Sequence, residues 1–293
     1  MKAGRIVRMS DRCKAELRAN GSAAHVDEFG DCIGIVEGLL DYNNAGEPRD
    51  PAKIGPEVDV RWQPSALRYG YHPEHLQVVK MIIAVDGPAA SGKGTLAKKI
   101  AGHFDLPFLD TGALYRATAR DLLATGGDLS DASQAVRAAQ NIDPASLDDP
   151  KLREPDIGEA ASMVAPMPEV RAALLEYQRR FAAGASGAVL DGRDIGTIVC
   201  PDADVKLFIK ADVKVRAHRR FLELSSKGLE ISEQQVLADL QKRDERDCSR
   251  DVAPLVPADD AHLLDTTNLG IESSYRAAIG VITAVLGEGG KMD

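Results

Sequence analysis

The chain has 293 residues, of which 44% are hydrophobic and 28% charged, a composition typical of a globular protein long enough for one large domain and a smaller one. It contains no run of about 18 or more apolar residues, and its net charge of -9 argues against a surface that tracks nucleic-acid phosphates, so we expect neither membrane nor nucleic-acid binding. No apolar signal core follows the N-terminus and the four cysteines form no Cys-x-x-Cys motif, which predicts a cytoplasmic protein with reduced thiols.

Residues 1–80 contain short β-like runs at Arg5–Val7, Ile33–Val36 and Val58–Trp62, separated by Gly, Pro, Asn and Asp. We therefore predict a small, mostly β, barrel-like domain over residues 1–80 and a second domain over residues 81–293. The cysteines and histidines of the first domain fit none of the common zinc templates, so we predict no zinc site there. The sequence identifies neither a function nor a partner for this domain.

The apolar run Ile82–Val85 shows no alternation, which is typical of a strand buried on both faces of a parallel sheet. Gly-Pro-Ala-Ala-Ser-Gly-Lys-Gly-Thr follows at residues 87–95, with the spacing of a phosphate-binding loop. In such a loop, small residues let backbone N–H groups converge on phosphate oxygens at the start of a helix, and Lys93 would add a positive charge. A glycine-rich turn that binds nothing is the alternative, but strand, loop, lysine, threonine and helix occur in the required order.

The glycine at position 94 departs from the strict loop pattern, in which Ser or Thr follows the lysine directly. Here the hydroxyl comes one residue later, at Thr95. This variant resembles the loop of nucleoside monophosphate kinases.

The segment after the loop predicts alternating helices and strands. In chain order, we expect a helix that includes Leu96–Phe104, a strand at Leu106–Leu109, a helix capped by Asp110 and Thr111 that runs to about Ala124, a helical piece at Ala132–Gln140, and a long helix that carries Arg171 and ends near Ala183. Between these helices, residues 128–155 are rich in Asp, Pro and Ala.

A second buried-type strand, Gly187–Leu190, ends in Asp191 and is followed by Gly192, Arg193 and Asp194. A carboxylate at the end of an apolar strand is a usual magnesium-organising group in phosphate-loop enzymes. The remaining expected elements are a strand at 205–209, helices at 213–226 and 233–247, a strand at 263–267 and a helix at 271–286. Strands alternating with helices predict a doubly wound parallel sheet that binds ligands at its carboxyl edge.

The two helices before the last strand are rich in arginine. They and the residues just beyond carry Arg216, Arg219, Arg220, Arg243, Arg246 and Arg250. Spacings of three, four and seven place such residues on one helical face. A solvated charged face is the alternative, above all for Arg246. The arrangement looks like the mobile lid of a nucleotide kinase, whose closure would bring guanidinium groups onto the transferring phosphoryl group.

Four separated motifs, namely the loop at 87–95, Asp-Thr-Gly-Ala-Leu-Tyr-Arg at 110–116, Asp-Gly-Arg-Asp-Ile-Gly-Thr at 191–197 and Ala-Pro-Leu at 253–255, resemble bacterial cytidylate kinases. The resemblance covers about residues 81–287. It implies an α/β P-loop kinase fold with a mobile lid and a monophosphate-binding lobe, and transfer of phosphate from ATP to CMP and dCMP with magnesium, by a monomer. The insert that typical members carry near residues 128–155 is shortened here.

The resemblance also implies site residues. The implied catalytic residues are Lys93, Arg193, Arg250 and Asp191. The implied ATP ligands are Gly87, Pro88, Ala89, Ala90, Ser91, Gly92, Lys93, Gly94, Thr95 and Arg219. For CMP, the implied ligands are Arg116, Arg193 and Arg250 with Tyr115 at the phosphate, Arg243 and Asp247 at the sugar, and Thr111, Ser162, Arg171 and Asp194 at the base. Magnesium would be held by Thr95 and Asp191, with water between for the latter.

Two other functions stay open at this point. One is a phosphate-loop kinase with a different small acceptor, although the motifs at 110–116 and 191–194 count against it. The other is a chain whose main role is partner binding through residues 1–80. Neither a histidine nor a paired-carboxylate constellation stands out as a general base, which agrees with an acceptor whose attacking oxygen is already anionic.

Overall fold

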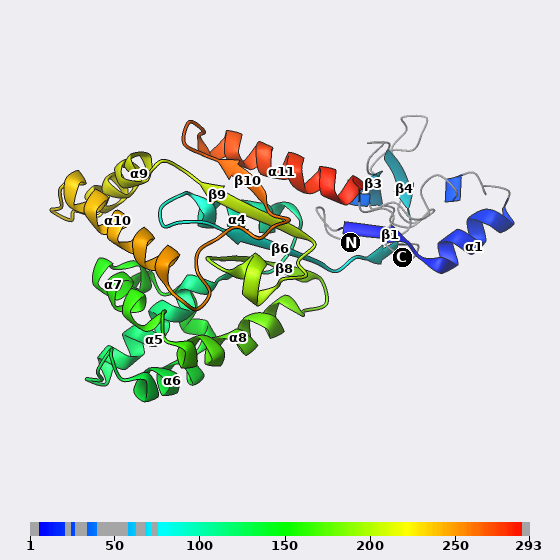
Figure 1. Ribbon diagram of the computed structural model, residues 1–293. Helices are drawn as coiled ribbons and strands as arrows, with labels where there is room; N and C mark the ends of the chain where they lie inside the picture. Colours follow the sequence, from blue (N-terminus) through cyan, green and yellow to red (C-terminus); the bar gives the residue numbers. More distant parts are fainter. Residues whose placement is uncertain are drawn as a thin grey trace.

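The computed structural model of the protein describes residues 6–20, 25–26, 34–39, 58–62, 68–71 and 76–288. These residues form two five-stranded sheets, one before residue 80 and one after it (Figure 1). In this part of the chain, no helix is both long enough and apolar enough to cross a bilayer.

The first sheet is antiparallel throughout, with the strand order β4-β3-β2-β1-β5. Its strands are β1 (Ile6–Met9), β2 (Gly34–Leu39), β3 (Val58–Trp62), β4 (Arg68–Tyr71) and β5 (Leu76–Val78), and helix α1 (Asp11–Ala19) follows β1. The described core side chains are Val7, Met9, Cys13, Val36, Val60 and Leu76. The prediction of a β-rich domain is confirmed. The sequence pattern did not predict α1, β4 or β5. Strands β4 and β5 are opposite edges of this sheet, so closure into a barrel stays a prediction, as does the domain division at residue 81.

The second sheet is parallel throughout, with the order β10-β9-β6-β8-β7, and confirms the predicted doubly wound fold. Its strands are β6 (Met81–Asp86), β7 (Phe108–Asp110), β8 (Gly187–Gly192), β9 (Val205–Lys210) and β10 (His262–Asp265). Every residue of β8 is buried, as expected for an internal strand covered on both faces.

Helices cover both faces of this sheet (Figure 1). They are α4 (Lys93–His103), α5 (Thr111–Ala124), α6 (Ala132–Gln140), α7 (Pro155–Val164), α8 (Pro168–Ala182), α9 (Val213–Ser226), α10 (Glu233–Ser249) and α11 (Ile271–Glu288). Short helical turns occur at η2 (Pro144–Asp148), η3 (Pro150–Arg153) and the π-helix η4 (Ile195–Val199). On one face Val85 packs with α4 and α11, and on the other Leu190 packs with α5 and α8, because successive strand side chains point to opposite faces.

The predicted elements of residues 81–288 are found, with shifted ends. Strand β7 begins at Phe108 rather than Leu106, because the Leu106 N–H donates to the Ala101 carbonyl at 2.9 Å and closes the end of α4. Strand β10 ends before Thr266, whose hydroxyl donates to the Ser91 carbonyl of the phosphate loop at 3.1 Å. The sequence pattern indicated neither α7 as a separate helix nor the π-helix η4.

Candidate active site

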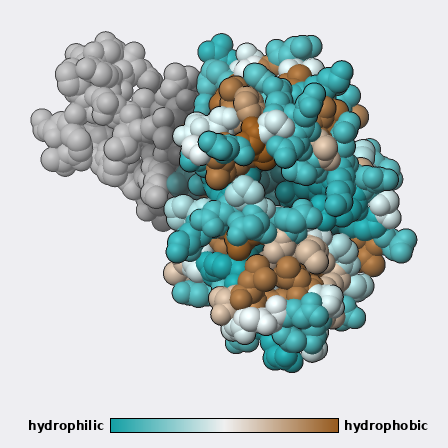
Figure 2. Space-filling model, turned by 90° about the vertical axis from the view of Figure 1, so that its left-hand side faces the viewer, coloured by the Kyte–Doolittle hydropathy of each residue, from teal (hydrophilic) through white to brown (hydrophobic). Residues whose placement is uncertain are grey.

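A cavity of about 950 Å³ opens at the carboxyl edge of the parallel sheet. Its walls come from the phosphate loop, the start of α5, η3, α7, the end of β8, α9, α10 and the start of α11. Figure 2 shows the face that carries α7, α9 and α10, where hydrophilic side chains surround a hollow between the upper and lower parts of the molecule. The position agrees with the general rule for ligand sites in open parallel sheets.

The phosphate loop is shaped by two glycines with positive φ. At Gly87 φ is 148°, and a Cβ there would lie 2.1 Å from the Ile209 carbonyl oxygen of β9, so only glycine fits. At Gly92 φ is 85°. This residue is the N-cap that precedes α4 and has no side chain to cap the helix, which leaves the first-turn N–H groups for an anion. Residues 89–95 line the cavity, as predicted. Gly87 and Pro88, which were also predicted ligands, belong to the loop but do not line the cavity.

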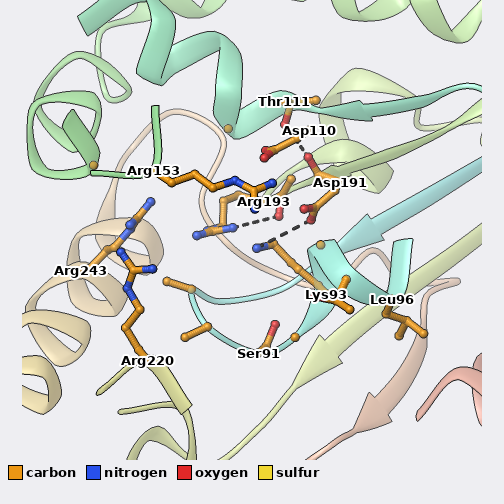
Figure 3. Close-up of a pocket in the computed structure, with 18 of the residues that line it drawn as sticks. Ser91, Lys93, Leu96, Asp110, Thr111, Arg153, Asp191, Arg193, Arg220 and Arg243 are labelled. Carbon is orange, nitrogen blue, oxygen red and sulfur yellow. Dashed lines mark hydrogen bonds and ion pairs between the residues drawn. The ribbon is translucent and has the colours of Figure 1, made fainter. Parts of the chain in front are cut away.

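Lys93 and Asp191 form an ion pair across the floor of the cavity, with 3.7 Å between Lys93 Nζ and Asp191 Oδ1 (Figure 3). Burial, and then repulsion from Arg193, lowers the pKa of Lys93 to about 8. Burial raises the pKa of Asp191, and attraction to Lys93 opposes that rise. A Cβ at Gly94 would lie 2.9 Å from Asp191 Oδ2, so any other residue after the loop lysine would require the Asp191 carboxylate to shift.

The three arginines predicted at the acceptor phosphate all line the cavity, and each has a carboxylate partner. Arg116 pairs with Asp110 at 2.7 Å, and Arg193 pairs with Asp247 at 2.8 Å. Arg250 lies 3.9 Å from the other oxygen of Asp247. Burial alone would raise the pKa of Asp110. The charges of Arg116 and Lys93 and the hydrogen bonds from Arg116 and the Ala113 N–H together outweigh burial, and the pKa falls below its ordinary value. The carboxylates therefore fix the guanidinium groups and balance their charges.

The residues predicted at the base form a buried polar wall. Arg171 and Asp194 are ion-paired, and Asp194 is only 6% exposed. The Arg171 guanidinium also lies 5.7 Å from the centre of the Tyr115 ring. The hydroxyl of Thr111 donates to the Asp191 carbonyl at 2.8 Å, and that of Ser162 donates within its own helix. Asp194 thus supports Arg171, whereas Arg193 has Asp247 as its partner.

Asp86 anchors the turn that presents Arg193 and Asp194, a role that sequence reasoning missed. Its two carboxylate oxygens accept hydrogen bonds from the N–H groups of Ile195 and Gly196, each at 2.8 Å, at the start of the π-helix. Burial raises the pKa of Asp86 to about 7, which these two hydrogen bonds oppose. The end of the strand before the phosphate loop is thereby tied to the acceptor side of the cavity.

The arginines of α9 and α10 have different roles. Arg219 and Arg243 line the cavity, as predicted; Arg219 donates to the Thr266 carbonyl at 2.7 Å. Burial, and then the Arg193 charge, lowers the pKa of Arg243 to about 10.

The expectation that the whole set faces the phosphoryl group is wrong for Arg216. This side chain is buried, pairs with Asp244 at 2.6 Å and donates to the Ala89 carbonyl at 3.1 Å, so it braces the loop against α10. Arg246 is not a solvated lone charge: its two terminal nitrogens contact both oxygens of Glu159 on α7, at 3.2 and 3.1 Å.

The cavity also contains Arg153 and Arg220, which were not among the predicted ligands. Figure 3 shows both side chains on the same side of the cavity as Arg193 and Arg243. Arg220 belongs to the arginine-rich helix already noted in the sequence. Arg153 follows Leu152 in an acidic, proline-containing segment with no helical periodicity, so the only available signal was a basic residue in that segment.

Comparison with known proteins agrees with this geometry. The family model described as cytidylate kinase matches residues 83–283. A cytidylate kinase of Rhodopseudomonas palustris (strain BisB18) is 60% identical over 205 residues, which cover 70% of this chain and 97% of that protein. The cytidylate kinase of Bradyrhizobium sp. (strain ORS 278) is 56% identical over 205 residues, with the same coverage. That of Methylocella silvestris is 57% identical over 202 residues, 69% of this chain and 94% of that protein.

Proposed function

The chain belongs to the cytidylate kinase family, and from this premise we propose that it transfers the γ-phosphoryl group of ATP to CMP, and also to dCMP, giving ADP and the corresponding diphosphate. One observation carries the proposal. A single cavity holds a phosphate loop with its lysine at one end and the Arg171–Asp194 pair at the other, with three carboxylate-paired arginines between them.

The reaction needs alignment and charge compensation rather than a general base, because the attacking phosphate oxygen of CMP is already anionic. In the proposed mechanism, Lys93 and the N–H groups of the loop hold the donor phosphates. The acceptor phosphate is held by Arg116, Arg193 and Arg250, beside Tyr115. These groups place two anions in line and offset their repulsion, which lowers the barrier to phosphoryl transfer.

Magnesium fits the oxygen groups at the donor end. Thr95 and Asp191 both line the cavity, and Oδ1 of Asp191 is buried without a hydrogen-bond partner among the described residues. Hydroxyl and carboxylate oxygens are the ligand types that Mg²⁺ prefers, with water completing its shell. We propose that Thr95 and, through water, Asp191 hold the ion, which when bound neutralises charge on the donor phosphates.

The base end of the cavity suits cytosine. Cytosine presents an exocyclic amino donor at position 4 and acceptors at N3 and O2. These edges match a carboxylate and a guanidinium, so we assign Asp194 and Arg171 as the base readers, with Thr111 and Ser162 nearby. Arg243 and Asp247 are assigned to the sugar and Arg219 to the ATP side.

An acceptor panel tests this function. ADP formation is measured with CMP, dCMP, UMP, AMP and GMP at equal concentration, with and without Mg²⁺. CMP and dCMP should be the preferred acceptors by a wide margin. Preference for another acceptor would favour the alternative of a phosphate-loop kinase with a different substrate.

No feature of the described part of residues 1–80 favours the second alternative, a chain that acts mainly through a partner of the first domain. We propose that the enzyme is a cytoplasmic monomer. Sedimentation of the full chain tests whether it is a monomer.

A further inference from the structure

The π-helix η4 is held at both of its ends by charged side chains from other elements. At its first residues, the carboxylate of Asp86 accepts from two backbone N–H groups. At its last residues, the guanidinium group of Arg179 on α8 donates to the Ile198 carbonyl at 2.9 Å and to the Val199 carbonyl at 3.1 Å. The last carbonyls of a helix have no partner within it, so a forked donor at this end satisfies groups that would otherwise depend on water.

The two residues that Arg179 holds are also the ones that fix the backbone of Asp194. The Ile198 N–H donates to the Asp194 carbonyl at 2.9 Å, and the Val199 N–H donates to the same oxygen at 3.1 Å. Asp194 is the N-cap of η4. A displacement at the end of η4 is therefore passed back, within one turn, to the residue that precedes it.

Asp194 is thus tied to helix α8 in two ways. Its side chain pairs with Arg171, and its backbone is linked through η4 to Arg179, further along the same helix. Helix α8 packs against β8, through Leu174 and Leu190 among others, and β8 leads into the turn that contains Asp194 (Figure 1). The helix therefore serves as a fixed support for both links.

The form of η4 makes this support important. A helix of one turn gains few hydrogen bonds for the dihedral angles that it fixes, so its geometry depends on contacts from outside. Its own i→i+5 bonds run from the Val199 N–H to the Asp194 carbonyl at 3.1 Å and from the Cys200 N–H to the Ile195 carbonyl at 2.7 Å. Turns of π-helix are rare and frequently occur at functional sites. The charged side chains at its two ends therefore help to fix its shape.

We propose that Arg179 is a positioning residue for recognition of the base: by holding the end of η4, it keeps Asp194 in place to accept from the amino group of cytosine. This inference rests on the proposed function, in which Asp194 and Arg171 bind that base. Arg179 does not line the cavity, so it acts through η4 and not by contact with the ligand. Its planar fork matches two neighbouring carbonyls, whereas a lysine would offer a point charge.

Amide hydrogen exchange tests the geometry, and acceptor specificity tests its consequence. Both are measured on the full-length enzyme and on Arg179→Met, Arg179→Lys and Arg180→Met. Arg180 is the matched control, because it is the next residue of α8, is exposed and does not line the cavity. In Arg179→Met, the amides of Ile198 and Val199 should exchange faster than in the wild type, since the end of η4 opens more often.

Loss of the charged donor should lower kcat/KM for CMP by roughly 10-fold, the lower range for a hydrogen bond made by a charged group. The loss with UMP should be smaller, because uracil has no amino group for Asp194 to accept from. The CMP to UMP ratio of kcat/KM should therefore fall, while the KM for ATP should not change. Arg179→Lys should recover part of the ratio, and Arg180→Met should match the wild type in every measurement.

Equal losses with CMP and UMP, at an unchanged ratio, would mean that Arg179 only stabilises the fold, and would overturn the inference. Unchanged exchange at Ile198 and Val199 would overturn it as well. If Arg179→Met does not fold, Arg179→Lys decides, and wild-type values of its ratio and exchange rates would count against the inference. Failure of the proposed function is distinguishable, because the wild-type enzyme itself would then not phosphorylate CMP, while the exchange rates would still report whether Arg179 holds η4.

Discussion

The two sheets of this chain have the same number of strands and opposite geometry. In the antiparallel sheet, neighbouring strands run in opposite directions, so the ends of successive strands alternate between its two edges. In the parallel sheet, all carboxyl ends meet at one edge, where Asp86 ends β6, Asp110 ends β7 and Asp191 lies next to the end of β8. Parallel geometry therefore gathers residues about a hundred positions apart in sequence around one cavity.

The two sheets also differ in whether charged side chains are buried around them. The described core of the antiparallel sheet consists of apolar side chains such as Val7, Met9 and Val60. The parallel-sheet region buries Asp86, Asp191, Asp194, Lys206 and Arg216. Buried charges are costly unless they are paired. Of these five, Asp191 and Asp194 line the cavity, whereas Asp86, Lys206 and Arg216 lie outside its lining and have hydrogen-bond or ion-pair partners. Each prediction below tests that contrast.

Replacing Lys93 should have the largest effect, because it removes the buried cation from the donor end of the cavity. We expect Lys93→Ala to lower kcat by roughly 10³-fold, the upper range for losing one preorganised electrostatic contact to a transition state. The measurement is steady-state turnover with CMP and ATP, together with thermal melting to confirm folding. Lys214→Ala, on an exposed lysine of α9 outside the cavity, is the control. Near-normal turnover of a folded Lys93→Ala enzyme contradicts catalysis by the phosphate loop.

Replacing Asp194 should change specificity more than it changes the fold. In a site that matches the hydrogen-bonding groups of cytosine, uracil would place acceptor against acceptor and donor against donor. Such mismatches can give a discrimination of roughly 10⁴, so the wild-type enzyme should favour CMP over UMP strongly. Asp194→Asn offers uracil's carbonyl a donor, and the CMP to UMP ratio of kcat/KM should collapse, mainly through loss of CMP activity.

The ratio is the decisive quantity because Asp194 also holds Arg171, and loss of that ion pair alone would reduce both activities together. An unchanged ratio would remove Asp194 from the base site. Asp156→Asn, an exposed substitution on α7 outside the cavity, should leave both activities as they are.

The ion pair between Arg246 on α10 and Glu159 on α7 should make a small contribution, because both side chains are partly exposed. Exposed pairs contribute about 0–1 kcal/mol, so Arg246→Glu or Glu159→Arg should raise the KM for CMP by at most a few-fold. The double exchange, Arg246→Glu with Glu159→Arg, should restore it, and high salt should reduce all the differences. Failure of the double exchange to improve on either single variant would show that the pair does not act as a unit.

Removing the antiparallel sheet should have the smallest effect on activity. A chain that starts at Met81 keeps every residue assigned to the cavity, so its kcat and its KM for CMP should match those of the full chain. A modest fall in melting temperature is expected, because Val79 packs against the core formed by Met81, α4 and α11. A folded but inactive truncated protein would mean that residues 1–80 complete the site, and the proposed division into two domains would be wrong.

Short sequence patterns were enough to predict much of the parallel-sheet region. The apolar run before Gly87, the loop up to Thr95 and the strand before Asp191 each have a signature contained in a few consecutive residues. A buried parallel strand needs a continuous apolar run, and a phosphate loop needs small residues at fixed spacing, so the sequence specifies both directly. The cap at Asp110 is equally local, and the structure shows its carboxylate accepting from the Ala113 N–H at 3.2 Å.

Only the tertiary structure decided which charged side chains meet. The arginine-rich helices gave no means of telling Arg216, which braces the loop, from Arg243, which faces the cavity, because both lie on amphipathic helices at similar spacing. Their roles follow from what packs opposite each helix. Arg153 reaches the cavity because Leu152 is buried against α5, some 40 residues earlier in the chain. Helical and strand periodicities report which face of an element is buried, whereas charge pairing depends on contacts between distant elements, and a single sequence carries no local record of those contacts.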